Sequence, residues 1–166
     1  YEVDFFPEPI AYNFGDELVK VPGLDGSTKM SKTGGETNAI FLNEEPESIR
    51  KKIMRAKSDG GPTTMNQEKP QEIINLFELM KIVSTPDTLA FFDNAYNNCV
   101  IRYGDMKKQL AEDMVNYLTP IRTRINELIN NEAYLQRVVS RGAEEARESA
   151  AKTISEVRKI MGISYF

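Results

Sequence analysis

The sequence predicts a mainly α fold, in which a helical bundle follows a short α/β segment. Apolar residues recur at helical spacing from position 46 onward, and helix-capping residues precede several of these stretches. Residues 1–45 are instead rich in glycine and proline. Hydrophobic residues make up 40% and charged residues 28% of the 166 positions, as in ordinary globular proteins.

Within the first 45 residues, the runs 19–21 and 39–42 are apolar and bounded by turn residues, which predicts short strands or extended segments. Helices follow. The first begins at Pro46, since proline suits the first helical position and Glu47 suits the positive end of the helix dipole. Its apolar stripe is Ile49, Ile53 and Ala56.

The other face of this first helix carries five cations and no acid. They are Arg50, Lys51, Lys52, Arg55 and Lys57. Such a row is either a solvated helix face or a patch that contacts phosphates, because like charges repel without anionic partners. The pattern alone leaves both readings open.

The remaining helices follow from the same signals. One starts at Pro70, and the next starts after an N-cap at Thr85. A long helix follows Gly104-Asp105, and Pro120 should kink or split it. Two final helices are expected at about 131–140 and 143–161. The total is a bundle of five or six helices.

Composition excludes several kinds of chemistry. The chain has no histidine, so histidine general bases and histidine-containing zinc sites are absent. Cys99 is the single cysteine, which excludes an intrachain disulfide and suits a reducing compartment such as the cytoplasm. No apolar run approaches the roughly 20 residues of a membrane span, so we expect no membrane partner. The net charge of −4 means that any RNA site must be a local patch.

The most informative stretch is Lys29-Met30-Ser31-Lys32-Thr33, within residues 22–35. Two lysines three residues apart lie among hydroxyl side chains, and glycines stand at both ends of the stretch. Such a loop can bring two cations and several hydrogen-bond donors onto a polyphosphate. The glycines, which are Gly26, Gly34 and Gly35, would let it bend and close.

Residues 22–33, Pro-Gly-Leu-Asp-Gly-Ser-Thr-Lys-Met-Ser-Lys-Thr, resemble the KMSKS loop, the second nucleotide-binding motif of class I aminoacyl-tRNA synthetases. The one departure is Thr33 in place of serine, which keeps the hydroxyl. Further runs at 96–108, 118–122 and 142–162 are similar to bacterial tryptophanyl-tRNA synthetases. They include Gly-Asp-Met-Lys-Lys and Leu-Thr-Pro-Ile-Arg, and the resemblance extends from Phe6 to the end.

The resemblance implies an enzyme that activates tryptophan with ATP and Mg²⁺ and transfers it to tRNA(Trp), as a homodimer when full-length. This chain then corresponds to the C-terminal part. Residues 1–45 would be the remnant of a Rossmann-like catalytic domain, and 46–166 the helical anticodon-binding domain. We expect the fragment alone to be inactive. The alternatives are a tyrosyl-tRNA synthetase fragment and a non-catalytic helical RNA-binding module.

The resemblance also implies site residues. Lys29 and Lys32 are the expected catalytic residues, which stabilise negative charge on the triphosphate. The expected ATP contacts are Lys29, Met30, Ser31, Lys32 and Thr33, although Met30 is better suited to packing beneath the loop. The expected tRNA contacts are Asn97, Asn98, Arg102, Tyr103, Lys107 and Lys108. No residue is expected to bind a metal ion directly.

Overall fold

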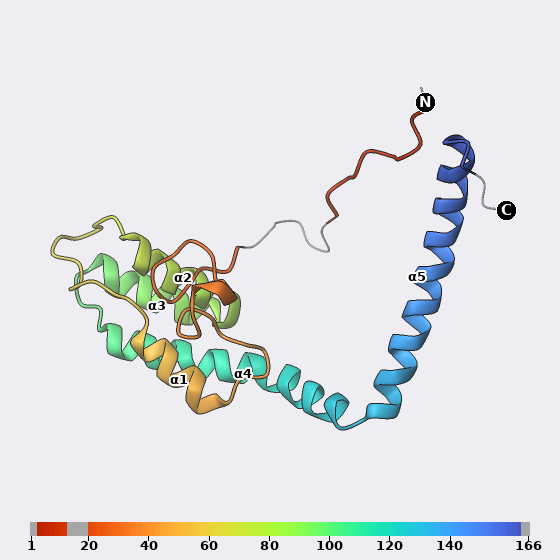
Figure 1. The fold of residues 1–166 in the computed structure, drawn as a ribbon. Coiled ribbons are helices and arrows are strands. Elements are labelled where there is room, and N and C mark those ends of the chain that lie inside the picture. The colour runs from red at the N-terminus through yellow and green to blue at the C-terminus, as the bar shows by residue number, and fades with distance from the viewer. Residues whose placement is uncertain (1–2, 13–19, 164–166) are drawn as a thin grey trace. The chain divides into compact units, whose positions relative to one another are not determined.

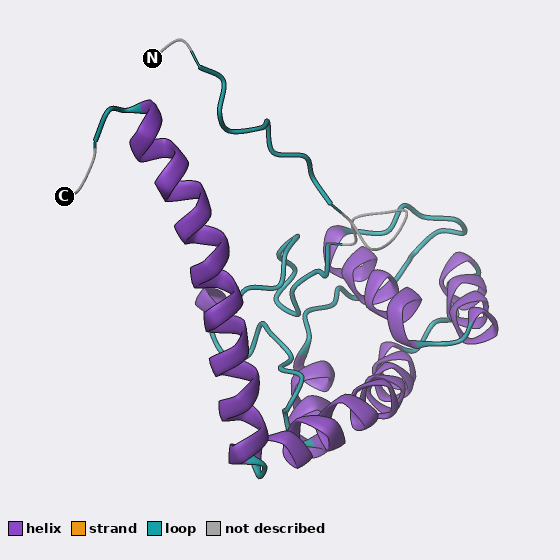
Figure 2. Ribbon diagram, turned by 90° about the vertical axis from the view of Figure 1, so that its right-hand side faces the viewer, coloured by secondary structure: helices purple, strands orange, loops and turns teal. Residues whose placement is uncertain are grey.

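The computed structural model describes residues 3–12 and 20–163, which form helices and loops without any β-strand (Figure 2). The prediction of a mainly α fold is confirmed. In chain order the elements are the 3-10 helix η1 (Lys32–Gly34) and the α-helices α1 (Pro46–Arg55), α2 (Gln71–Val83), α3 (Pro86–Asn97), α4 (Tyr103–Ile129) and α5 (Glu132–Ile160) (Figure 1). Within the described residues, no helix combines the length and the apolar character needed to cross a membrane.

The chain divides into two compact units. One is Val19–Asn126, which holds the lysine loop, α1, α2, α3 and most of α4; the other combines Tyr1–Leu18 with Glu127–Phe166 and holds α5. Residues on both sides of the predicted domain boundary at 45 lie in the first unit. That boundary stays a prediction.

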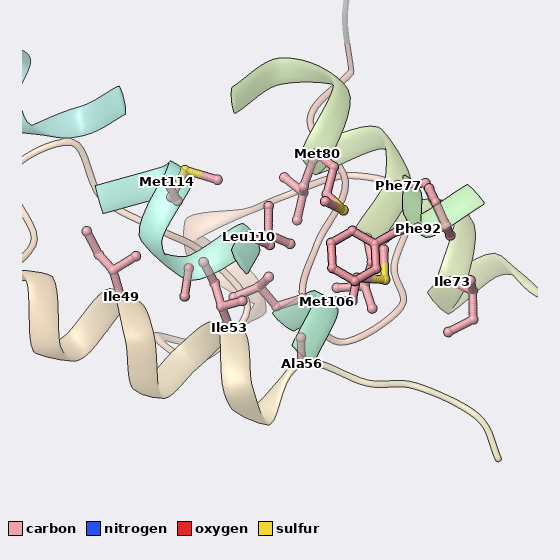
Figure 3. Close-up of a cluster of buried hydrophobic side chains, with 14 of the residues drawn as sticks. Ile49, Ile53, Ala56, Ile73, Phe77, Met80, Phe92, Met106, Leu110 and Met114 are labelled. Atoms are coloured by element: carbon pink, nitrogen blue, oxygen red, sulfur yellow. The ribbon is translucent and has the colours of Figure 1, made fainter. Parts of the chain in front are cut away.

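The core of the first unit lies between α1, α2, α3 and α4. Figure 3 shows Ile49 and Ile53 of α1 directed toward Leu110 of α4, and Met80 of α2 and Phe92 of α3 belong to the same buried cluster. Burying a side chain of this size contributes roughly 1.5–3 kcal/mol relative to leaving it in water. The apolar stripes read from the sequence are therefore the faces that these helices bury.

The predicted helix starts at α1 and α3 are confirmed. Pro46 occupies the first turn of α1, with Glu47 beside it. At α3, the Thr85 hydroxyl accepts a hydrogen bond of 3.2 Å from the Thr88 amide, and Pro86 follows directly. These caps satisfy amides that have no partner inside the helix.

Of the short strands or extended segments predicted near the N-terminus, the strand alternative is wrong for the described residues. Positions 20–21 and 39–42 are irregular, and position 19 lies outside the described residues. Their main-chain groups make isolated hydrogen bonds instead of the repeated hydrogen bonds of a β-ladder. The Val21 carbonyl accepts from the Met30 amide at 2.7 Å, and the Ala39 carbonyl accepts from Lys52 Nζ at 2.9 Å. A strand needs a neighbour over several residues, and neither run has one among the described residues.

The long helix α4 continues through Pro120, so a split at that residue is wrong. Proline removes the amide that would bond the carbonyl four residues earlier. That carbonyl belongs to Asn116, an exposed residue, so water can satisfy it. Hydroxyls bond the neighbouring carbonyls: Thr119 Oγ1 donates to Val115 O at 2.7 Å, and Thr123 Oγ1 donates to Thr119 O at 2.9 Å.

The two final helices predicted from the sequence are one helix, α5. Asn131 caps it by accepting a hydrogen bond of 3.1 Å from the Tyr134 amide. Gly142 does not end the helix, because glycine inside a helix costs only about 1 kcal/mol relative to alanine. The described residues therefore form five α-helices, of which α5 has no buried residue.

Candidate nucleotide and RNA sites

A tight turn at residues 23–27 supports the lysine loop. The Gly23 amide donates to the Ser27 carbonyl at 3.0 Å, and Asp25 Oδ1 accepts from the Ser27 amide at 2.9 Å. Hydrogen bonds from Ser27 hold the pKa of the Asp25 carboxyl below its usual range. Gly26 has a φ of 93°, a conformation that residues with a β-carbon rarely adopt. The turn thus requires the glycine that the sequence places there.

Lys29 and Lys32 lie beyond this turn, and both are exposed. Neither makes an ion pair with another described residue, so both ammonium groups are available to an anion. Ser31 caps η1 by accepting a hydrogen bond of 3.2 Å from the Thr33 amide, and the two hydroxyls lie 2.7 Å apart. The loop is therefore locally ordered by its hydroxyls while its lysines stay free.

Met30 lies partly buried against the core, as expected for a residue that packs beneath the loop. Its amide donates to Val21 O at 2.7 Å, and its sulfur accepts from the Ile40 amide at 3.4 Å. Next to it is a largely apolar hollow of about 350 Å³, whose lining includes Met30, Lys32 and Tyr117. The methionine therefore connects the lysine loop to the helical core.

The cationic face of α1 is less uniform than its sequence indicates. Arg50 bonds Glu112 of α4 at 2.7 Å and Glu47 at 2.7 Å. Lys52 pairs with Glu44 at 2.6 Å. Burial raises the pKa of Glu44, but hydrogen bonds from Lys52 and Ser48 outweigh this and leave it below its usual value. Glu47 lies in the first turn of α1, while Glu112 and Glu44 come from other segments, and together they neutralise two of the five cations.

The other three cations of α1 and its end, Lys51, Arg55 and Lys57, make no ion pair with a described residue. They line one hollow of about 590 Å³ together with Asp25 and Glu36. A phosphate-contacting patch, if α1 has one, consists of these three residues.

The junction of α3 and α4 forms a hollow of about 520 Å³. Asn98 and Arg102, two of the predicted tRNA contacts, line it. The structure adds Phe91, which is 66% exposed, together with Asn94 and Asp105. A flat ring, amides, a guanidinium and a carboxylate are the groups that bind an unstacked base. We call this set of residues the α3–α4 corner.

Sequence reasoning missed Phe91 and Asn94. A signal was present, because Phe91 stands next to the stripe of Leu89, Phe92 and Tyr96, and a helix directs neighbouring residues to different faces. An aromatic residue outside the apolar stripe is a candidate for binding.

Other predicted tRNA contacts do not reach the α3–α4 corner. Asn97 donates from Nδ2 to Asp93 Oδ2 at 3.0 Å. Tyr103 is half-buried with its hydroxyl oxygen buried, and burial raises its pKa well above the usual value, with Asp59 nearby adding to the shift. Lys108 is exposed but does not line the hollow.

Lys107 is the clearest departure from the predicted set, because it is only 8% exposed. Its ammonium donates to Ala56 O at 2.7 Å and to Ser58 Oγ at 2.9 Å. Ala56 is the C-cap of α1, where a cation is favoured by the helix dipole. Burial lowers the pKa of Lys107. The contacts of this lysine join α1 to α4 and leave no exposed ammonium for RNA.

A family model described as tRNA synthetases class I (W and Y) matches residues 6–119. The chain belongs to this family. The match includes the lysine loop and every residue of the α3–α4 corner.

Relatives of this class I synthetase chain carry the name tryptophan–tRNA ligase. One from Porphyromonas gingivalis is 55% identical over 162 residues, covering 98% of this chain and 49% of the relative. One from Helicobacter pylori is 35% identical over 159 residues, covering 95% of this chain and 46% of the relative. The resemblance to tryptophanyl-tRNA synthetases is confirmed. The chain spans about half the length of the curated relatives it matches.

Solved structures agree on the fold. The tryptophanyl-tRNA synthetase of Campylobacter jejuni, complexed with ADP and tryptophan, matches 89% of this chain with a TM-score of 0.68 and 23% identity. The match covers 45% of that chain. The helical arrangement is therefore that of the corresponding part of a tryptophanyl enzyme.

Proposed function

We propose that this chain is the part of a tryptophan–tRNA ligase that binds the triphosphate of ATP and the anticodon arm of tRNA(Trp). The observation that carries the proposal is the pair Lys29 and Lys32, which are exposed and make no ion pair with a described residue, in a loop of the synthetase family. The names of the relatives favour tryptophan over tyrosine as the amino acid.

In the first step, the tryptophan carboxylate attacks the α-phosphorus of ATP and pyrophosphate leaves. Negative charge builds on the departing β- and γ-phosphates. Lys29 and Lys32 would stabilise this charge more in the transition state than in the ground state, which is what accelerates a reaction. Ser31 and Thr33 would add hydroxyl hydrogen bonds. This step needs little proton transfer, so a chain without histidine can support it.

In the second step, a ribose hydroxyl at the tRNA 3′ end attacks the carbonyl carbon of tryptophanyl-adenylate, which forms the aminoacyl ester and releases AMP. The α3–α4 corner would bind an anticodon base, with Phe91 stacking on it and Arg102, Asn98 or Asp105 bonding its edge. Lys51, Arg55 and Lys57 would contact the RNA backbone. The alternative, a non-catalytic RNA-binding module, would make these two contacts with RNA but would not use the lysine loop to bind a nucleotide.

The proposal includes Mg²⁺, which would bind together with ATP. Within the described residues, no three His, Cys, Asp or Glu side chains gather where they could hold a metal ion. Enzymes that use ATP usually bind Mg²⁺ through the substrate phosphates together with one or two protein carboxylates. When bound, the ion would share the neutralisation of the phosphates, and we assign none of its ligands to this chain. The homodimeric state and the cytoplasmic location rest on the resemblance alone.

The test is Lys32→Ala in the full-length enzyme. Loss of one preorganised donor should cost about 3 kcal/mol, or about 10²-fold in the rate of adenylate formation. Pre-steady-state measurement of tryptophanyl-adenylate isolates this step. Lys159→Ala, an exposed lysine of α5, is the matched control. An unchanged rate for Lys32→Ala would remove the proposed role. Tryptophan-dependent ATP–pyrophosphate exchange by the 166-residue chain alone would instead overturn the prediction that this part of the enzyme is inactive by itself.

A further inference from the structure

Asn75 of α2 is a buried polar residue whose side chain bonds the turn below the lysine loop. It is 3% exposed. Its Nδ2 donates to the Gly23 carbonyl at 3.1 Å and to the Ser27 carbonyl at 2.8 Å. Its Oδ1 accepts from Gln71 Nε2 at 2.8 Å. Both amide hydrogens of Asn75 are thus directed at a turn that lies about 50 residues earlier in the chain.

A second buried amide supports the same turn from its other side. Asn38 is 3% exposed; its Oδ1 accepts from the Asp25 amide at 3.4 Å, and its Nδ2 donates to Ser27 Oγ at 3.4 Å. Packing here leaves no room for a larger residue at Gly23. A β-carbon at that position would lie 2.2 Å from Asn38 Oδ1 and 2.2 Å from Ser27 Oγ.

The other end of the loop is fixed as well. Lys52 of α1 pairs with Glu44 at 2.6 Å and donates to Ala39 O at 2.9 Å. The segment that carries the exposed Lys29 and Lys32 therefore extends between these two anchored points, with Met30 between the lysines contacting the core. The position of each lysine depends on where these anchors hold the backbone.

We propose that Asn75 is a positioning residue for the phosphate-binding loop, and that it ties α2 of the helical bundle to the ATP step. This proposal rests on the function proposed for Lys29 and Lys32. Asn75 touches no reacting atom; it acts through the turn from which the lysines extend. Catalytic groups misplaced by about 1 Å lose up to 10²-fold in rate, so a weakened anchor should lower kcat.

The discriminating variant is Asn75→Asp, which keeps the side-chain size but replaces the donor with a carboxylate oxygen. That oxygen would face two carbonyls and repel them. In the full-length enzyme we expect kcat of tryptophan-dependent ATP–pyrophosphate exchange to fall about 10-fold. The KM for tryptophan should stay within twofold. Asn116→Asp, which adds the same charge at an exposed position of α4, should leave both parameters unchanged.

A double-mutant cycle with Lys32→Ala separates positioning from general destabilisation. If Asn75 acts through the loop lysine, Asn75→Asp should lower kcat less than threefold in an enzyme that already carries Lys32→Ala, because the effects of coupled sites are not additive. An equal fold loss of kcat from Asn75→Asp in the native enzyme and in the Lys32→Ala enzyme would overturn the proposal. So would an unchanged kcat for Asn75→Asp while Lys32→Ala loses its expected 10²-fold, an outcome that leaves the proposed function intact.

A folding defect must be distinguished from a positioning effect. Asn75→Ala removes the donor without adding charge, and active-site titration by the adenylate burst counts the folded enzyme in each preparation. We expect a reduced rate per active site in both variants. A full rate per active site, with only fewer active sites, would show that Asn75 is merely structural and would overturn the proposal.

Discussion

The lysine loop and the start of α4 both carry two lysines within a sequence motif, yet the structure places these cations differently. In the loop, Lys29 and Lys32 are both exposed and without ion pairs among the described residues. At the start of α4, Lys107 turns inward to Ala56 while its neighbour Lys108 stays exposed. The lysine loop leaves both of its lysines in water, whereas a helix directs adjacent residues to different faces. Adjacent lysines in a helical motif are therefore not equivalent.

Among the variants that test this comparison of lysines and polar sites, the largest effect is expected from Lys107→Ala. The substitution leaves the Ala56 carbonyl and the Ser58 hydroxyl without their donor, and should lower the free energy of unfolding by about 2 kcal/mol. Urea denaturation of the 166-residue chain measures this. Lys108→Ala is the matched control and should change stability by less than about 0.5 kcal/mol. Equal stabilities for the two variants would break the distinction between the inward and outward lysines.

Phe91→Ala tests the corner itself. Loss of base stacking should weaken the affinity for a tRNA(Trp) transcript about 10-fold, since stacking on an aromatic ring is worth about 1–3 kcal/mol. Fluorescence anisotropy with the full-length enzyme gives the dissociation constant. Phe6→Ala removes an equally large ring with a similar exposure, 65% against 66%, and should have no effect. If both variants bind alike, Phe91 is not a base-stacking residue.

The smallest effect is expected from Arg55→Gln. One lost phosphate contact should weaken tRNA binding about threefold and reduce the slope of log K against log salt by about 1. A salt titration of the same anisotropy assay measures the slope. Arg50→Gln, in the same helix but paired with Glu112 in the native protein, should leave the slope unchanged. A reduced slope for Arg50→Gln alone would reverse the division of α1 into paired and free cations.

Much of the architecture could be predicted locally. The caps at Pro46 and Thr85 and the apolar stripe through Ile49 and Ile53 depend on residues within one or two turns, and the structure confirms them. Helix interruptions were harder to predict. Pro120 and Gly142 are weak helix formers, but the free energy that each costs is smaller than the stabilisation that the surrounding helical turns contribute. Both therefore lie within continuous helices.

The sequence by itself determined the family, the mainly α fold and the lysine loop, because these depend on the order and spacing of residues along the chain. Only the tertiary structure decided which cations are free. Glu112, one of the two acids that pair with Arg50, lies 62 residues away in α4, and the carbonyls that Asn75 bonds lie 48 and 52 residues away. Pairings at such separations follow from the packing of α1 and α2 against the rest of the unit, which no local pattern records.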